Sequence, residues 1–207
     1  MDKSKLAVST YNKIAGIYSN KYFDDLSDTF YINKFLSILP PKSEILEVGS
    51  GPGQFVKYIA EKGFKATGID LSEKMIEIAR KKVPEAKFKV MDMRDMKFKD
   101  ASFDGLMAPY SLIHIPSDEI HQTLRGFSRV LKPNGKLLVI AQNGEADKVI
   151  GEPLKEGEIT FVNFFTKERL SKFLIEAGFR IFYVEEKETY DPGTMSNRVI
   201  YTIAQKV

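Results

Sequence analysis

Residues 45–55, with the sequence ILEVGSGPGQF, constrain this 207-residue chain more than any other segment. The apolar residues before the glycines favour a strand that is covered on both faces of a sheet. Gly49, Gly51 and Gly53 then allow backbone angles and a close ligand approach that a Cβ atom would block. A buried strand that runs into such a turn and then into a helix is typical of a cradle for a nucleotide cofactor.

The spacing of the glycines separates two kinds of cofactor. A dinucleotide fingerprint needs G-x-G-x-x-G, but its last place is Gln54 when it starts at Gly49 and Val56 when it starts at Gly51. Asp70 follows Gly51 by nineteen residues and ends the predicted strand 65–70. A carboxylate at that place accepts hydrogen bonds from both hydroxyls of a ribose. The sequence therefore predicts a nucleoside cofactor and disfavours NAD(P).

With the pattern E-x-G-x-G-x-G starting at Glu47, the chain resembles the class I S-adenosylmethionine (SAM)-dependent methyltransferases of the small-molecule type. The resemblance runs from about Glu44 to Ala141 and implies that the glycine turn lies against the methionine part of SAM. It also implies that Asp92 and Met93, after the third strand, hold the adenine. The alternative for Asp92 is to cap a turn with its side chain.

The full set of cofactor-binding residues that we predict is Tyr11, Tyr18, Glu47, Gly49, Ser50, Gly51, Gly53, Gln54, Asp70, Leu71, Met75, Asp92, Met93, Arg94 and Ala108. Two of these roles have alternatives. Glu47 either holds the amino group of SAM or braces the glycine turn by accepting backbone N–H bonds. Tyr11 and Tyr18, seven residues apart on one helical face, either close over SAM as part of a lid or pack on the core.

Strands alternate with amphipathic helices along the chain, which predicts an α/β fold with a parallel sheet. The resemblance implies a doubly wound, mostly parallel sheet of seven strands in the order 3-2-1-4-5-7-6, the last strand antiparallel, with helices on both faces and an N-terminal helical cap. Residues 180–187 and 198–205 are predicted to be the last two strands, joined by a turn at 191–193. We expect one domain, residues 1–207, with a cap or lid at 1–40, a SAM-binding core at 41–143 and a substrate-side segment at 144–207.

His114 and Tyr110 are the catalytic candidates, in the loop that follows the fourth strand. A neutral imidazole near pH 7 can take a proton from an acceptor. The alternative for His114 is to order the cofactor pocket. His121, on the next helix, is predicted to be a surface residue.

The acceptor is predicted to be a small molecule. Methyltransferases of base amines usually carry Asn or Asp before Pro-Pro and an aromatic residue, whereas this chain has Ala108-Pro109-Tyr110, which counts against nucleic-acid bases. Phe161, Phe164 and Phe165 either wall an apolar acceptor pocket or pack in the core.

Composition limits the classes of function that the chain can have. A net charge of +3 with dispersed lysines does not indicate nucleic-acid binding, and the absence of cysteine together with only two histidines disfavours a metal site. No apolar run or leader indicates a membrane or secretion, so we expect a cytoplasmic protein, monomeric or homodimeric. The predicted function is transfer of a methyl group from SAM, with S-adenosylhomocysteine as product. The alternatives are a non-catalytic SAM-binding regulator and an NAD(P)-dependent oxidoreductase.

Overall fold

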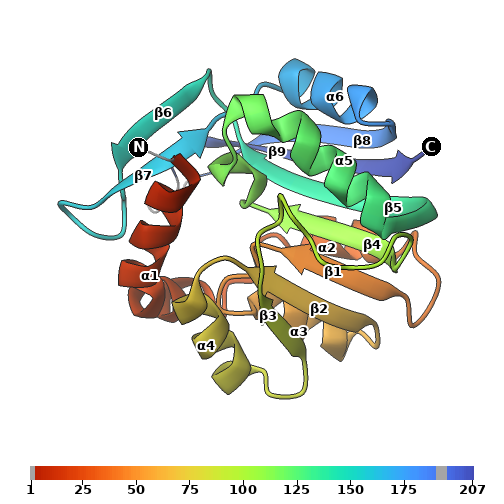
Figure 1. The fold of residues 1–207 in the computed structure, drawn as a ribbon, viewed down its shortest axis with the longest axis horizontal. Helices are drawn as coiled ribbons and strands as arrows, with labels where there is room; N and C mark the ends of the chain where they lie inside the picture. The colour runs from red at the N-terminus through yellow and green to blue at the C-terminus, as the bar shows by residue number, and fades with distance from the viewer. Residues whose placement is uncertain (1–2, 190–194) are drawn as a thin grey trace.

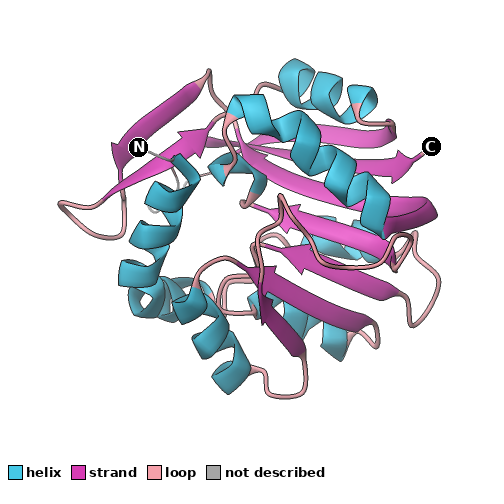
Figure 2. Ribbon diagram, in the orientation of Figure 1, coloured by secondary structure: helices cyan, strands magenta, loops and turns pink. Residues whose placement is uncertain are grey.

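The computed structural model describes residues 3–189 and 195–207, which form a sheet, helices on both of its faces and a separate hairpin (Figures 1 and 2). The helices are α1 Lys3–Tyr22, α2 Thr29–Leu36, α3 Gln54–Glu61, α4 Glu73–Lys82, α5 Ile120–Val130 and α6 Lys167–Glu176, with single 3-10 turns at Leu112–His114 and Ser117–Glu119. The strands are β1 Glu44–Val48, β2 Lys65–Asp70, β3 Lys87–Val90, β4 Phe103–Pro109, β5 Leu131–Gln142, β6 Asp147–Gly151, β7 Ile159–Asn163, β8 Phe179–Glu188 and β9 Arg198–Lys206. The turn predicted at 191–193 lies outside the described residues.

The main sheet has seven strands in the order β3-β2-β1-β4-β5-β9-β8. Strands β1 to β5 pair in parallel, and β9 is antiparallel to both of its neighbours. Because β6 and β7 form a sheet of their own, β8 and β9 are the sixth and seventh strands of the main sheet. The predicted order 3-2-1-4-5-7-6 and the antiparallel last strand are confirmed.

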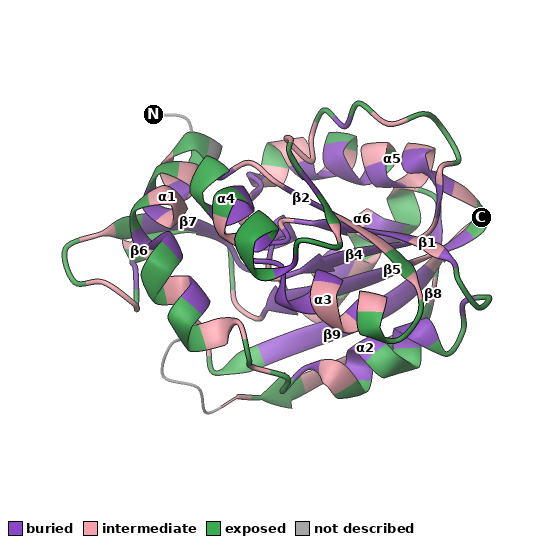
Figure 3. Ribbon diagram, turned by 90° about the horizontal axis from the view of Figure 1, so that it is seen from below, coloured by how far each residue is buried: buried purple, intermediate pink, exposed green. Residues whose placement is uncertain are grey.

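Different helices cover the two faces of the sheet. Leu124 and Phe127 of α5 pack with Leu170 of α6 on one face, while Phe35 of α2 packs with Ile59 of α3 on the other. Figure 1 shows α5 and α6 in front of the sheet and α2 and α3 behind it. The central strands are therefore buried on both sides, as their continuous apolar runs predict (Figure 3).

The hairpin β6–β7 was not predicted from the sequence. Strand β6 has no buried residue and carries Asp147 and Lys148, so it lacks the alternation that indicates a half-buried strand. Its partner β7 is mostly buried. Strand β6 is held by its pairing with β7, by polar contacts and by the half-buried Ile150, which packs against the core.

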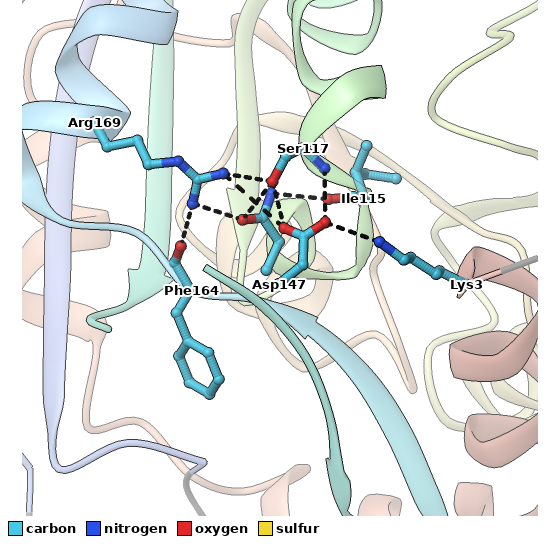
Figure 4. A network of polar contacts seen from close by, with 7 residues as sticks. Lys3, Ile115, Ser117, Asp147, Phe164 and Arg169 are labelled. Atoms are coloured by element: carbon cyan, nitrogen blue, oxygen red, sulfur yellow. Dashed lines mark hydrogen bonds and ion pairs between the residues drawn. The ribbon is translucent and has the colours of Figure 1, made fainter. Parts of the chain in front are cut away.

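One polar network anchors this hairpin to the rest of the fold (Figure 4). Ser117, before α5, donates both its backbone N–H and its hydroxyl to the carboxylate of Asp147. Arg169 of α6 donates to Ser117 Oγ and to the carbonyl oxygen of Phe164, and Lys3 of α1 lies 3.2 Å from Asp147 Oδ2. Burial opposes the ionisation of Asp147, but the hydrogen bonds from Ser117 and Lys3 outweigh it and lower the pKa of this carboxyl.

Helix α1 stands apart from the two helix layers, between α4 and the hairpin (Figure 1). Thr10 Oγ1 donates to the carbonyl oxygen of Ile159 over 2.6 Å, and Lys13 Nζ lies 2.8 Å from Glu158. On its other side, Asn12 Oδ1 accepts a hydrogen bond from Ser72 Oγ at 2.7 Å, at the start of α4. In contrast, α2 belongs to the core layer, so within the predicted cap at 1–40 it is α1 that lies outside the core. Within the two described stretches, no helix combines the length and apolar character needed to cross a membrane.

Candidate functional site

The glycine turn leaves β1 at the point where the sheet continues through β2 on one side and β4 on the other. In open parallel sheets ligands bind at such a point, because the chain connections diverge to opposite faces and leave a crevice. Gly49 has φ +66°, and a Cβ there would collide with the side chain of Ser111. A Cβ on Gly51, at φ +52°, would meet nothing closer than Tyr18 at 3.8 Å. The turn is thus closely packed at Gly49 and open at Gly51.

Asp70 ends β2 and connects the turn to the start of α4. Its Oδ2 accepts a hydrogen bond from the Gly51 N–H at 2.9 Å, and its Oδ1 accepts one from the Ser72 N–H at 2.8 Å. With a third backbone hydrogen bond from Leu71, about one of the roughly four acceptor positions of the carboxylate is left for another donor. Burial raises the pKa of Asp70, while hydrogen bonds from Ser72, Gly51 and Leu71 oppose the rise.

A cavity of about 100 Å³ lies at the carboxyl ends of β1, β2 and β4, beside the inner side of α1. We name it the turn-side cavity. It is lined by Ala7, Val8, Tyr11, Tyr18, Gly49, Gly51, Asp70, Leu71, Ser72, Met75, Met91, Asp92, Met93, Arg94, Pro109, Tyr110, Ser111, His114 and Ile115.

Asp92 lies on the wall of the turn-side cavity, and its side chain also caps a turn, which was the alternative role predicted for it. Its Oδ1 accepts a hydrogen bond from the backbone N–H of Arg94 at 2.8 Å, which is an Asx turn. The Arg94 guanidinium also binds the Asp92 carboxylate, with Nη2 at 2.6 Å from Oδ2, and reaches Glu119 at 2.8 Å. Arg94 Nε also lies 3.0 Å from both carboxylate oxygens, so Arg94 takes most of the roughly four acceptor positions of Asp92.

Glu47 lies behind the turn, with 2% of its surface exposed. Its carboxylate accepts a hydrogen bond from the backbone N–H of Val56, but its Oε2 atom is buried without a partner. Burial, and next the charge of Asp70, raises the pKa of Glu47 well above its usual range. Buried polar atoms are seldom left unpaired, yet this oxygen has no donor in the described part of the chain, and Glu47 does not line the turn-side cavity.

His114 is held between two partners. Its Nδ1 lies 2.9 Å from the carbonyl oxygen of Phe161, which can only accept, so Nδ1 carries the proton. Its Nε2 then accepts a hydrogen bond from the Tyr11 hydroxyl at 3.1 Å. Burial lowers the pKa of His114 to about 4, so the ring is neutral at pH 7 and a weak base. This geometry favours the ordering of Tyr11 over direct proton abstraction.

A second cavity, of about 330 Å³, adjoins the first and extends toward the β6–β7 connection. We name it the hairpin-side cavity. It is lined by Tyr11, Tyr18, Tyr22, Asp25, Ser27, Asp28, Gln54, Phe55, Tyr110, Ile113, Gln142, Glu152, Leu154, Thr189 and Met195. Three tyrosines, Tyr11, Tyr18 and Tyr110, line both cavities and mark the boundary between them.

Tyr110 is fixed at this boundary by a strained backbone and by a hydrogen bond. Its φ of +51° is uncommon outside glycine and is found at functional sites. Its hydroxyl lies 3.3 Å from Asp28 Oδ1, which also accepts from the Tyr201 hydroxyl at 2.7 Å. Burial, followed by the charge of Asp28, raises the pKa of Tyr110 well above its usual range, so its hydroxyl stays protonated at neutral pH.

Ten of the fifteen predicted cofactor residues line the turn-side cavity, namely Tyr11, Tyr18, Gly49, Gly51, Asp70, Leu71, Met75, Asp92, Met93 and Arg94. Of the others, Gln54 lines the hairpin-side cavity, and Glu47, Ser50, Gly53 and Ala108 line neither. Gly53 and Ala108 have a packing role, because a Cβ on Gly53 would lie 2.8 Å from Phe88 and Ala108 is fully buried in β4. The three phenylalanines at 161, 164 and 165 are buried and line neither cavity, so of their two predicted roles they take the core one.

Sequence reasoning missed most of the hairpin-side cavity, including Asp25, Asp28, Gln142 and Glu152. They lie on three segments that no local motif connects. Ala7 and Val8 of α1 were also missed, although their spacing of four and three residues before Tyr11 places them on one helical face. Among the described residues, no three His, Asp or Glu side chains come together as ligands for a metal ion.

Comparisons with known proteins agree with this geometry. A family model described as a methyltransferase domain matches residues 45–135. The demethylmenaquinone methyltransferase of Chlorobaculum tepidum is 30% identical over 184 residues, which cover 76% of this chain and 72% of that protein. A putative methyltransferase of Bacillus subtilis, YqeM, is 37% identical over 105 residues, which cover 48% of this chain and 42% of that protein. The chain thus spans less than two thirds of the length of some of its curated relatives.

Solved structures confirm the fold. A SAM-dependent methyltransferase of Methanosarcina mazei has a TM-score of 0.76 and 24% identity, covering 85% of this chain and 96% of that one. The 1,6-didemethyltoxoflavin-N1-methyltransferase of Burkholderia thailandensis, solved with bound 1,6-didemethyltoxoflavin and S-adenosylhomocysteine, has a TM-score of 0.78 and 17% identity. That match covers 100% of this chain and 91% of the Burkholderia chain.

Proposed function

The chain belongs to the SAM-dependent methyltransferases, and from this membership we propose that it transfers the methyl group of SAM to a small-molecule acceptor. The observation that carries the proposal is the pair of adjoining cavities that meet at Tyr11, Tyr18 and Tyr110. One cavity lies at the switch point of the sheet, where a nucleoside cofactor is bound in folds of this kind. The other offers a separate space for the acceptor.

The residues at the turn fit SAM in chemistry. Asp70 offers a remaining carboxylate lone pair to the ribose hydroxyls. Asp92 would accept from the exocyclic amine of adenine in place of part of its contact with Arg94, with Met93 beside it. Glu47 has an unpartnered carboxylate oxygen for the amino group of the methionine part. Gly51, which has no side chain, leaves room at the turn. SAM supplies a methyl group on a positively charged sulfur, which is itself the leaving group.

The protein's contribution to methyl transfer is to align the acceptor and to exclude water. We assign this work to α1 and to the loop after β4. The rings of Tyr11 and Tyr18 lie edge to face at 5.7 Å, and the Tyr11 and His114 rings lie 5.0 Å apart. His114 is a positioning residue in this scheme, because its Nε2 holds the Tyr11 hydroxyl at the boundary between the cavities.

The first test is a calorimetric titration with S-adenosylhomocysteine, with NAD as the comparison. We expect micromolar binding of S-adenosylhomocysteine and none of NAD. Asp70→Ala removes the ribose acceptor and is expected to abolish binding, whereas Asp95→Ala is a matched control, because Asp95 is 70% exposed and paired with Lys97. Preference for NAD, or equal loss in the two variants, would contradict the proposal.

The second test measures turnover. Production of S-adenosylhomocysteine from SAM, followed by mass spectrometry across a panel of small acceptors, separates a methyltransferase from a regulator that only binds SAM. Tight binding with no turnover on any acceptor would favour the regulator.

A further inference from the structure

The hairpin-side cavity is acidic. Three of its lining residues carry carboxylates, Asp25, Asp28 and Glu152, and its described lining contains no Lys, Arg or His. None of these three carboxylates forms an ion pair within residues 3–189 and 195–207. A cavity with this charge balance repels an anionic acceptor and attracts a cationic one.

Glu152 is the member of this group with a buried carboxylate oxygen that lacks a partner among the described residues. The residue is 5% exposed, its Oε1 accepts a hydrogen bond from the Leu154 N–H at 3.2 Å, and its Oε2 is buried without a partner. Asp28, in contrast, accepts from two tyrosine hydroxyls, and Asp25 Oδ1 accepts from the Ser27 N–H at 2.9 Å. A buried carboxylate oxygen without a donor is unfavourable, and a donor inside the cavity removes that penalty.

Other lining groups favour the same kind of ligand. The side-chain oxygens of Gln54 and Gln142 are also buried without partners. Tyrosine rings line the wall, and aromatic faces attract cations that have lost their water. At about 330 Å³ the cavity lies at the lower end of the size range for ligand pockets.

We propose that this cavity binds the acceptor as a small amine with an apolar or aromatic body, and that Glu152 holds the nitrogen and takes its proton. The inference rests on the proposed function and names the acceptor class of that same site. An ammonium bound by Glu152 gives one proton to the carboxylate and becomes a neutral amine. The lone pair of its nitrogen then attacks the methyl carbon, a C–N bond forms, the C–S bond breaks and its electron pair goes to sulfur. The products are the protonated N-methylated amine, S-adenosylhomocysteine and a protonated Glu152, whose proton then leaves to solvent.

The environment of Glu152 suits the role of a proton acceptor. Burial raises the pKa of its carboxyl, which makes the carboxylate a stronger base than an exposed one. Its charge also contributes, after burial, to the raised pKa values of Tyr11 and Tyr18, the tyrosines at the boundary with the turn-side cavity. The carboxylate therefore lies within electrostatic reach of the place where the two substrates meet.

The test is a charge series of probes, titrated into the protein saturated with S-adenosylhomocysteine. The probes are 2-phenylethylamine, 2-phenylethanol and 3-phenylpropionate, which are similar in shape and differ in charge. We expect the amine to bind about ten- to a hundredfold more tightly than the alcohol, the range for a hydrogen bond to a charged group, and the acid not to bind. Equal binding of amine and alcohol, or no binding of the amine, overturns the inference without any variant.

Glu152→Gln keeps the shape of the side chain and removes its charge. We expect this variant to lose the preference for the amine and to keep its affinity for S-adenosylhomocysteine, while Glu156→Gln, an exposed position in the same connection, keeps both. If Glu152→Gln loses its affinity for S-adenosylhomocysteine, Glu152 holds the cofactor and the inference is wrong. If the unmodified protein does not bind S-adenosylhomocysteine, the proposed function itself fails.

Discussion

Replacing Gly49 by alanine tests how closely the glycine turn approaches the loop after β4. Two effects add at this position. Alanine at φ +66° costs about 1–2 kcal/mol, and a Cβ that collides with Ser111 adds about 1–3 kcal/mol for overpacking. Gly63 is the matched control, because its φ is +85° and a Cβ there meets nothing within 4 Å. We expect Gly49→Ala to lower the free energy of unfolding by about 1–3 kcal/mol more than Gly63→Ala.

Urea denaturation of both variants measures this difference, since the backbone strain and the change in unfolded-chain entropy are similar at the two positions. Ser111→Gly in the Gly49→Ala background removes the atom that collides, so we expect it to recover most of the excess loss, whereas Ser111→Ala, which keeps its Cβ, recovers none. Equal destabilisation at positions 49 and 63, or equal effects of the two Ser111 changes, would refute the reasoning.

Three further predictions concern helix α1, Asp92 and the pH dependence of stability. Asn12→Ala removes the hydrogen bond between α1 and the start of α4. We expect stopped-flow measurements to show that S-adenosylhomocysteine dissociates about five- to tenfold faster from this variant. In the control Lys13→Ala, which loses only an exposed ion pair, the dissociation rate should change by less than about twofold. Asp92→Ala is expected to weaken the binding of S-adenosylhomocysteine about tenfold, as measured by calorimetry. An equally large loss of affinity in Asp95→Ala would count against a specific role of Asp92. The pKa of His114 is lowered to about 4 by burial, so the folded state resists protonation that the unfolded chain accepts near pH 6.5, and stability falls as the pH drops below that value. Between pH 7 and pH 5 we expect the free energy of unfolding to fall by about 2 kcal/mol because of His114, and urea titrations at the two pH values measure this loss. His114→Gln should not show it, and parallel pH profiles of the two proteins would exclude this role of His114.

The core of the fold was predictable because its signals are local. The apolar run before Gly49 indicates a strand buried on both faces, and Asp70 follows a second strand at a fixed distance. Both residues line the turn-side cavity, and their binding of the cofactor stays a prediction. A motif of this kind works because one short segment provides strand, turn and helix together, so its geometry hardly depends on the rest of the chain.

The hairpin-side cavity has no such signal. Asp25 and Asp28 lie between α1 and α2, Gln142 ends β5 and Glu152 follows β6, so their meeting depends on tertiary packing. The His114 prediction shows the same limit in another form. The residue type suggested a base, but its two ring nitrogens are directed at the Phe161 carbonyl and the Tyr11 hydroxyl, and both partners come from segments distant in the sequence.

The two cavities also differ in the structural elements that form them. The turn-side cavity is built largely from strand ends and their first turns, which the sheet fixes by backbone pairing. The hairpin-side cavity takes Glu152 and Leu154 from the β6–β7 connection and Tyr18 and Tyr22 from α1, elements outside the two core layers. Substitutions in the β6–β7 connection are therefore expected to alter the proposed acceptor site without removing core packing. Since α1 is joined to the hairpin through Thr10 and Lys13 and to α4 through Asn12, displacement of α1 would open both cavities at once. Under the proposed function, we expect cofactor release and acceptor entry to be coupled through α1, so a change that loosens this helix should affect the binding of both ligands.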